Sequence, residues 1–468
     1  MPTKIEEQLP LALRYRANGH TDLRDAAAGD NKTLPVHRWV PWIAGFSAQF
    51  VQDAIETYLP KRNREHQVVL DPFAGVGTTL IEALKANCNT VGHEINPFAA
   101  LAADAKVNCI DANVRTFKGK IESFSRDLAS FEARVDRRWL QHGEKSVRAI
   151  ISSLATNQPQ GFRSRIPFFS PPVEAKFLHA LSLIVSFREP YRNLFRAALG
   201  ATMVSFSNYT YEPSLSSRPG AGKPLIENTS VGQAVTRKLM AMQEDISLVI
   251  SQYSRTWKSR RRDVFTSSYF DSPLAPRSVS LLVTSPPYMN NYHYVRNTRP
   301  QLYWLGLVNG AGSLRCYEEE SFGKFWQTVR QGPTIELQPH LPQLESLIAK
   351  LQGQTIDRGQ YGGPGWANYV ATYFNDCDRF LSQASQQLKP GGRAIIVVGN
   401  SIIQGIEFKV DELLAQLSET HHFTFEDIMH VRKKRVGNSI IDSSVRNGHK
   451  VPHKGRTQLY DAAVVLRR

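Results

Sequence analysis

Short apolar runs alternate with amphipathic stretches along most of this chain. The runs have the length of strands, and most are rich in Val, Ile and Leu. We place strands at 68–70, 89–93, 263–265, 278–283, 393–398, 423–431 and 462–466. Strands that alternate with helices predict an α/β fold in which helices cover both faces of a largely parallel sheet.

The segments between these runs carry apolar residues at helical spacing. The predicted helices are 48–58, 78–86, 98–107, 121–140, 172–187, 236–253, 369–388 and 411–417. Ser47 is suited to cap the first helix, because its hydroxyl can accept a hydrogen bond from a free backbone N–H. Pro97 suits the first turn of the third helix, where no N–H is needed.

The same pattern divides the chain into a core and its insertions. Residues 1–36 are polar and broken by glycine, which indicates an N-terminal arm or capping segment. Residues 37–110 form the first half of the core, and the mostly helical residues 111–260 form an insertion. The second half of the core spans 261–468. It includes 308–365, where Gly, Pro and polar residues without sustained periodicity predict a loop insertion.

A glycine-rich segment connects the first predicted strand to a helix. It runs Asp71-Pro72-Phe73-Ala74-Gly75-Val76-Gly77-Thr78-Thr79. Gly75 and Gly77 let the backbone approach a ligand closely and permit positive φ. The helix that begins at Thr78 points free N–H groups toward the same place. The spacing matches neither the dinucleotide fingerprint nor a phosphate-binding loop, so the glycines alone do not name the ligand.

Glu94 stands at the end of the second predicted strand. An acidic residue at this place can accept both hydroxyl hydrogens of a ribose, as in dinucleotide-binding folds. A solvated charge at a strand end is the common alternative for an isolated glutamate. The order of strand, glycine loop, helix, strand and acidic residue favours a role in ligand binding.

The strand at 278–283 ends in Thr284-Ser285-Pro286-Pro287-Tyr288. Neither proline can donate an N–H and each fixes its own φ, so the sheet ladder cannot continue. A hydroxyl, a stiff backbone and a ring then stand at the carboxyl end of a strand, where open α/β sheets bind ligands. In isolation the segment would more often be a simple strand end with a packed ring. The glycine-rich segment elsewhere in the chain favours a binding site.

Together the two segments resemble those of the amino-methylating DNA methyltransferases. In that family a D-P-F-x-G-x-G-T-T segment binds S-adenosylmethionine, and an (S/N/D)-P-P-(Y/F) segment holds the base. The resemblance covers about residues 37–108 and 262–310, with a looser match at 366–401, and it implies a Rossmann-like methyltransferase sheet. The serine form is most typical of the cytosine-N4 branch, whereas the adenine-N6 branch usually has Asp at the position of Ser285. The cofactor half comes first here, the reverse of many such enzymes.

The resemblance also implies a role for individual residues. The cofactor-binding set is Asp71, Pro72, Phe73, Gly75, Gly77, Thr78, Thr79, Glu94 and Asn96, with Trp39, Trp42 and Phe46 as an apolar surface beside the methionine part. The catalytic set is Ser285, Pro286, Pro287 and Tyr288. The family's acidic or small polar contact to the cofactor's adenine is not clearly aligned; its candidates are Asp263, Ser267 and Ser268.

The implied reaction is direct methyl transfer to the exocyclic amine of a base turned out of the duplex. The amine is a poor nucleophile, so the Ser285 hydroxyl and the Pro286 carbonyl would hold its hydrogens in the transferring geometry while Tyr288 stacks on the base. The leading hypothesis is site-specific transfer to cytosine N4, in the setting of a restriction–modification or phage-defence system. The alternatives are adenine N6, an RNA amine, and a DNA-binding protein without activity.

The chain of 468 residues has a formal net charge of +15. Lys and Arg neutralise phosphates, so the charge indicates a polyanionic partner. The resemblance implies that this partner is double-stranded DNA, and a cognate restriction endonuclease would be a second. A solvated charged face is the common alternative for a basic run. The residues that we expect to contact DNA are Arg260, Arg261, Arg262, Tyr292, Arg296, Lys433, Lys434 and Arg435.

Four cysteines, Cys88, Cys109, Cys316 and Cys377, are too few and too scattered for a disulfide framework or a zinc site. We expect reduced thiols and no metal. Methylation of a cytosine ring carbon is disfavoured, because it needs a cysteine nucleophile, commonly after proline, and none of these follows one. No apolar run has membrane-spanning length, and residues 1–18 lack the apolar core of a signal peptide, so we expect a cytoplasmic protein.

Overall fold

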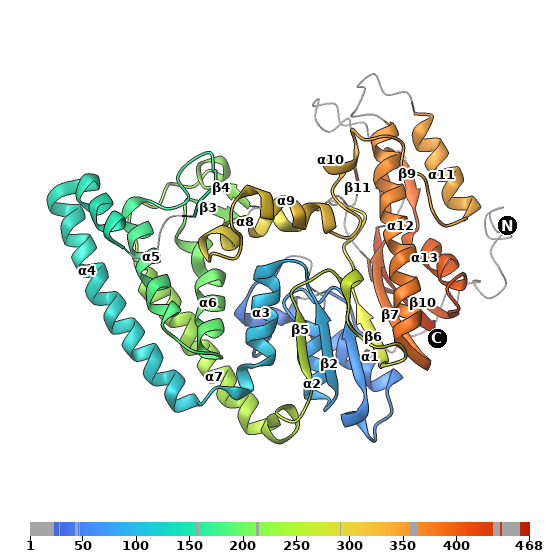
Figure 1. Ribbon diagram of the computed structural model, residues 1–468, viewed down its shortest axis with the longest axis horizontal. Helices are drawn as coiled ribbons and strands as arrows, with labels where there is room; N and C mark the ends of the chain where they lie inside the picture. Colours follow the sequence, from blue (N-terminus) through green and yellow to red (C-terminus); the bar gives the residue numbers. More distant parts are fainter. Residues whose placement is uncertain are drawn as a thin grey trace.

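The computed structural model describes residues 23–27, 29–42, 45, 47–154, 159–211, 215–290, 292–354, 363–433, 440–441 and 459–468. A twisted sheet lies at the centre, a group of long helices at one end, and the C-terminal part of the chain, coloured orange and red, at the other (Figure 1). Helices α8 (Tyr294–Trp304) and α9 (Ala311–Glu320) lie along the top of that view, between the two ends.

The central sheet has the strand order β10-β12-β7-β6-β1-β2-β5. Neighbours from β7 to β5 are parallel, whereas β12 is antiparallel to both β7 and β10. This arrangement confirms the predicted α/β fold with a mostly parallel sheet. The bounds are β1 (Val68–Asp71), β2 (Asn89–His93), β5 (Arg262–Phe265), β6 (Val279–Thr284), β7 (Leu388–Gly399), β10 (Thr424–Lys433) and β12 (Tyr460–Arg467).

Both faces of the sheet are covered because successive strand residues point to opposite sides. On one face Val69, Leu281 and Ile395 pack in a core with α1 (Ala48–Tyr58) and with Ala83 of α2 (Thr78–Lys85). On the other face the alternate strand residues pack with α12 (Gly363–Gln387) and α13 (Val410–Glu419). The predicted caps are present as well: the Ser47 hydroxyl accepts from two backbone N–H groups of α1, and Pro97 begins α3 (Pro97–Val107).

The region predicted as a helical insertion is formed by α4 (Val114–Ser153), α5 (Pro171–Val185), α6 (Tyr191–Thr202) and α7 (Val231–Trp257). A short hairpin, β3 (Tyr209–Tyr211) and β4 (Leu215–Ser217), follows α6. Buried residues from all four helices belong to the same apolar core as α2 and α3, while Phe131, Val135 and Val147 of α4 form a separate small core with Ala175 of α5. The insertion therefore packs as a continuation of the sheet's helical layer.

The prediction of a loop insertion at 308–365 is wrong, because the described part of this segment contains helices. It contains α9, α10 (Trp326–Val329) and α11 (Pro342–Gln352), and α11 packs against α12. Leu344, Ile348 and Leu351 are buried at helical spacing, a short period that the surrounding Gly and Pro obscured. Beyond β7 lies a small second sheet of β8 (Ser401–Ile403), β9 (Ile406–Phe408) and β11 (Ile440–Ile441).

The N-terminal segment that precedes α1 is held by two buried carboxylates. It contains two short turns of 3₁₀-helix, at Asp30–Lys32 and His37–Trp39. Asp245 of α7 accepts hydrogen bonds from the backbone N–H of Val36, from the Trp39 indole and from the Arg38 guanidinium. The second carboxylate, Glu82 of α2, pairs with His37 at 2.6 Å. At least part of the predicted N-terminal arm is thus a packed cap.

No helix among the residues described is both long and apolar enough to cross a lipid bilayer.

We expect Asp245→Ala to lower the free energy of unfolding by about 1–3 kcal/mol for each buried donor left without a partner. Those donors are the Val36 N–H and the Trp39 indole, both in the segment that precedes α1. Denaturant unfolding measures the change. Glu244→Ala is the matched control, because Glu244 is exposed one position earlier on α7, and its effect is expected to stay within about 0.5 kcal/mol. An equally small loss in Asp245→Ala would contradict this account of the cap.

Candidate active site

A cavity opens at the carboxyl ends of β1, β2, β5 and β6, where β1 and β6 lie side by side. This is the edge at which open α/β sheets bind ligands. The glycine-rich segment and the Ser285–Tyr288 segment lie far apart in the sequence but line this cavity together. The predicted site residues on its wall are Pro72, Phe73, Gly75, Thr78, Glu94, Asn96, Ser285, Pro287, Tyr288 and Tyr292.

The glycine-rich loop has the geometry that its glycines predicted. Gly75 has φ +51° and Gly77 has φ +86°, which disfavours other residues at both positions. Gly77 is the N-cap of α2, and a Cβ there would lie 3.1 Å from the Cβ of Ala103 on α3. A Cβ on Gly75 would lie 3.3 Å from the Trp42 indole nitrogen. The loop can therefore lie close to both α3 and Trp42.

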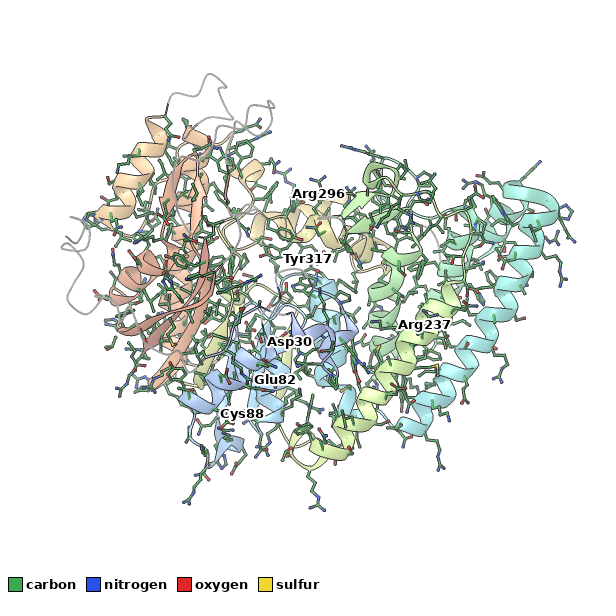
Figure 2. All side chains as sticks on the ribbon, turned by 180° about the vertical axis from the view of Figure 1, so that it is seen from behind. Asp30, Glu82, Cys88, Arg237, Arg296 and Tyr317 are labelled. Carbon is green, nitrogen blue, oxygen red and sulfur yellow. The ribbon has the colours of Figure 1, made fainter. Side chains whose placement is uncertain are left out.

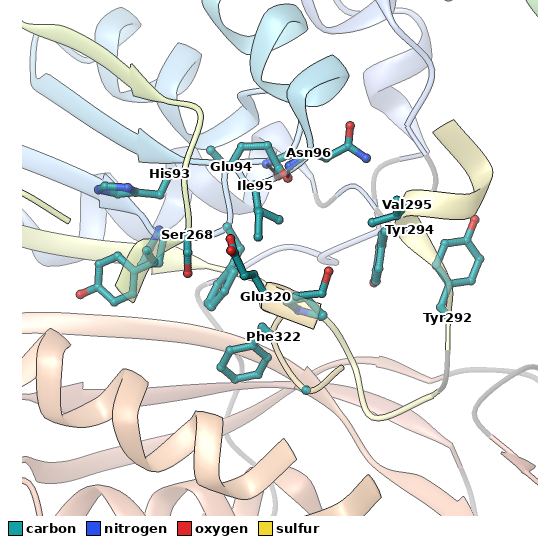
Figure 3. Close-up of a pocket in the computed structure, with 18 of the residues that line it drawn as sticks. His93, Glu94, Ile95, Asn96, Ser268, Tyr292, Tyr294, Val295, Glu320 and Phe322 are labelled. Atoms are coloured by element: carbon teal, nitrogen blue, oxygen red, sulfur yellow. Dashed lines mark hydrogen bonds between the residues drawn. The ribbon is translucent and has the colours of Figure 1, made fainter. Parts of the chain in front are cut away.

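Glu94 connects the glycine-rich loop, which follows β1, to the loop that follows β2. Its carboxylate accepts one hydrogen bond from the Gly75 N–H and one from the Asn96 N–H, each at 2.8 Å. Burial raises the pKa of this carboxyl to about 7, although the two N–H donors act in the opposite direction. Asn96 caps α3 and donates to the Thr298 hydroxyl of α8 at 2.7 Å. Figure 3 shows Glu94 and Asn96 together on one wall of the cavity.

Asp71 does not line this cavity, in contrast to its predicted contact with the cofactor. Its carboxylate is 1% exposed and accepts hydrogen bonds from the Thr284 hydroxyl at 2.6 Å and from the Phe73 N–H at 3.1 Å. Burial raises its pKa to about 6 against the effect of these donors. Asp71 thus connects the end of β1 to the end of β6. Thr79 is also buried and donates to the Val283 carbonyl of β6.

The Ser285 hydroxyl faces the cavity with weak internal bonds. It lies 3.3 Å from the Val397 carbonyl and 3.4 Å from the Tyr288 hydroxyl, at the outer limit of hydrogen-bond distance. A hydroxyl that donates to either oxygen keeps its lone pairs available to accept. Burial, with the nearby Asp461 carboxylate, raises the pKa of Tyr288 far above its usual range, so its phenol stays neutral. Pro286 is buried and does not line the cavity.

Sequence reasoning missed one wall of the cavity. Glu318 and Glu320 of α9 line it together with Phe322, and Figure 3 shows the last two below Glu94 and Asn96. They lie in the segment predicted to be a loop. Phe322 contacts Phe73 edge-on, with ring centroids 4.9 Å apart. The two aromatic residues Phe322 and Trp326, four positions apart in the sequence, were the signal that this segment is packed.

The predicted aromatic surface is present in part. Trp39 does not line the cavity; it is 1% exposed and its indole N–H bonds Asp245 at 2.9 Å, so it belongs to the core. Trp42 does line the cavity. Phe46 lies outside the described residues. Of the candidates for the adenine contact, Ser267 and Ser268 line the cavity, whereas the Asp263 carboxylate pairs with Arg261.

The arginine run before β5 lies at the wrong edge of the sheet for the predicted contact. Arg262 is the first residue of β5, and the cavity adjoins the other end of that strand. In Figure 1 the run follows α7 at the bottom of the view. Arg260 donates to the Glu65 carbonyl, and Arg262 pairs with Asp111 at 3.1 Å. The expectation that this run lies beside the site is therefore wrong.

The other residues predicted to contact DNA lie in different parts of the molecule. Tyr292 lines the cavity, and Arg296 is exposed near the start of α8, on the opposite side of the molecule from Cys88 (Figure 2). Lys433 is exposed at the end of β10. Lys434 and Arg435 lie outside the described residues.

All four cysteines are free thiols. The described part of the chain holds no group of three or more His, Cys, Asp and Glu side chains that could bind a metal ion.

Comparison with known proteins points to one family. A family model described as "DNA methylase", for N6 and N4 methyltransferases, matches residues 29–104, which include the glycine-rich loop and Glu94. The chain is also similar to the Type II methyltransferase M.AvaI of Anabaena variabilis, at 23% identity over 425 residues, 85% of this chain and 81% of that protein. These similarities support the predicted resemblance to the amino-methylating DNA methyltransferases.

Two further relatives extend the similarity over most of the molecule. The Type II methyltransferase M.BsoBI of Geobacillus stearothermophilus is 22% identical over 444 residues, 87% of this chain and 82% of its own. M.MvaI of Kocuria varians is 20% identical over 432 residues, 89% of this chain and 88% of its own. The similarity to these methyltransferases therefore extends through the helical insertion as well as the sheet.

We expect Thr284→Val to lower the free energy of unfolding by about 1–3 kcal/mol at pH 8, because the buried Asp71 carboxylate loses its shortest hydrogen bond. The loss should be smaller at pH 5, below the pKa of about 6, where Asp71 is neutral and the bond is weaker. Denaturant unfolding at both pH values measures this. An equal loss of unfolding free energy at pH 8 and pH 5 would show that the destabilisation does not come from the bond between Thr284 and Asp71.

Proposed function

We propose that this methyltransferase transfers a methyl group from S-adenosylmethionine to the exocyclic N4 amine of a cytosine turned out of double-stranded DNA. The observation that carries the proposal is the shared cavity: the glycine-rich loop and the Ser285–Tyr288 segment meet there. A methyl donor held by the glycine-rich loop would face a methyl acceptor held by the Ser285–Tyr288 segment. The Type II names of the relatives favour a role in restriction–modification, and a DNA substrate of that kind would place the protein in the cytoplasm.

The lining suits this cofactor. S-adenosylmethionine combines a flat adenine, a ribose with two hydroxyls and a cationic sulfonium. Phe73, Tyr269 and Phe270 offer rings near the end of β5, and Ser267 and Ser268 offer small polar groups for the adenine edge. Glu94 keeps lone pairs for ribose hydroxyls, because each of its oxygens accepts one backbone N–H bond. The acidic side chains of α9 suit a cation.

The cofactor supplies an electrophilic methyl group, and the chain's own residues hold the acceptor. Ser285, with its hydrogen directed to an internal oxygen, would accept one N–H of the cytosine amine. The Pro286 carbonyl, the second acceptor that the resemblance implies, belongs to a residue that does not line the cavity, so Ser285 is the acceptor that the geometry supports. Tyr288, whose neutral phenol lies close to Ser285, would stack on the base, which is worth about 1–3 kcal/mol. Holding both reactants in line supplies most of the proposed rate enhancement.

Product analysis tests the acceptor. Unmethylated DNA incubated with the protein and S-adenosylmethionine should yield N4-methylcytosine when its nucleosides are separated and weighed by mass spectrometry. Ser285→Ala should slow the transfer by about 10–100-fold, the worth of one well-placed hydrogen bond in a site without water. Ser251→Ala, an exposed serine on α7, is the control and should leave the rate unchanged.

The outcomes of this experiment separate the hypotheses. N6-methyladenine as the product would replace the cytosine assignment by its main alternative. A product on RNA alone would change the substrate. No methylated nucleoside from protein that binds the cofactor would overturn the enzymatic proposal in favour of DNA binding without activity.

Cofactor affinity should depend on pH through Glu94. The carboxyl is ionised above its pKa of about 7, and only the ionised form offers both oxygens as full acceptors. The dissociation constant should therefore rise about tenfold as the pH falls from 8 to 6. Glu94→Gln should weaken binding at pH 8 and remove most of this dependence. Isothermal titration at each pH provides the measurement; a variant with the wild-type pH profile would exclude Glu94 as the ribose ligand.

A further inference from the structure

A second cavity adjoins the first on the side of the helical insertion. The two share the Trp42, Val76, Thr78, Tyr292 and Tyr294 side chains as a common wall. The rest of the second cavity is formed by the end of α6, the β3–β4 hairpin, the N-terminal segment and α8. It therefore connects the proposed methyl-transfer site with the insertion.

The two cavities differ in charge. The first has Glu94, Glu318 and Glu320 on its wall, and one lysine, Lys324. No acidic residue lines the second among the described residues, whereas Lys32, Arg218 and Arg38 do, the last of them paired with Asp245. Lys32 is exposed, and the Arg218 side chain donates one hydrogen bond, from Nε to the Pro224 carbonyl. The first cavity suits a cationic ligand and the second an anionic one.

Gln301 of α8 lines this second cavity and carries a buried acceptor. The residue is 4% exposed and lines the cavity. Its amide nitrogen lies near the Gly200 carbonyl, at 3.4 Å, and near the Tyr211 hydroxyl, at 3.2 Å. Its carbonyl oxygen has no hydrogen-bond partner within the described structure. Since a buried polar atom without a partner costs about 1–3 kcal/mol, the oxygen is suited to a ligand with an N–H donor.

The hairpin is positioned by the same helix. The Tyr211 hydroxyl donates to the Asn297 carbonyl at 3.0 Å, and the Leu215 N–H donates to the Asn297 side chain at 3.2 Å. Tyr209, Tyr211, Tyr292 and Tyr294 thus surround the cavity with rings on which a flat ligand can stack. A flat ring with an N–H donor, joined to an anion, describes a nucleotide.

This ligand is distinct from the base that receives the methyl group. Ser285, Pro287 and Tyr288 line the first cavity but not the second. We propose that the second cavity binds one further unstacked nucleotide of the DNA, with its base donating an N–H to Gln301 and its phosphate near Lys32 and Arg218. The inference rests on the proposed function, because it requires that DNA be the substrate.

Fluorescent duplexes test the inference. Long-read sequencing of DNA methylated by the full chain first gives the recognition site. Duplexes containing this site then carry 2-aminopurine, which brightens when it leaves the base stack, at each position in turn. With a non-reactive cofactor analogue, we expect bright signals at the acceptor position and at one further position. Gln301→Leu and Arg218→Ala should each remove the second signal and retain the first. Arg255→Ala, an exposed arginine on α7, should retain both.

Each outcome decides the matter. A signal at the acceptor position alone, from protein that methylates, would overturn the second nucleotide and leave the proposed function intact. A second signal that survives both variants would show that another part of the protein binds that nucleotide. Failure of methylation and of both signals would overturn the proposed function and this inference with it. Gln301 also supports the hairpin through Tyr211, so Gln301→Leu can disturb the hairpin as well as the cavity. Arg218→Ala tests the cavity without removing that support.

Discussion

The hydrogen bond between the Asp71 carboxylate and the Thr284 hydroxyl holds the candidate site together. It connects the carboxyl ends of β1 and β6, the neighbouring strands from which the glycine-rich loop and the diproline segment arise. An ionised group at 1% exposure is costly, and burial accordingly raises its pKa. The bond fixes the end of β1 to the end of β6, directly beside the two loops that line the cavity.

Glu94 and Asn96 extend this frame outward. The Glu94 carboxylate joins the glycine-rich loop to the start of α3, and the Asn96 amide joins α3 to α8. Helix α8 in turn supports the β3–β4 hairpin through Asn297 and Gln301. A continuous series of buried polar contacts therefore runs from the central sheet to the insertion. Both cavities are built on it, so the insertion and the proposed transfer site share one support.

Most of the fold could be predicted from local signals in the sequence. The apolar runs that became β1, β6 and β7 are nearly continuous because both faces of these strands are buried. Ser47, Gly77 and Pro97 begin the helices where their chemistry suggests. The segment at 308–365 was less predictable, because its helices are short and depend on packing against α12 for most of their stability.

The sequence by itself determined the types of groups at the site: the glycines with positive φ, the acidic end of β2, and the serine and ring around two prolines. These depend on neighbours along the chain, so local order suffices to identify them. Only the tertiary structure decided which side chains face the cavity. It buried Trp39 and Asp71, brought Glu318 and Glu320 onto the wall, and placed Arg260 to Arg262 at the other edge of the sheet. The direction in which a side chain points is set by the elements packed around it, and those are distant in the sequence.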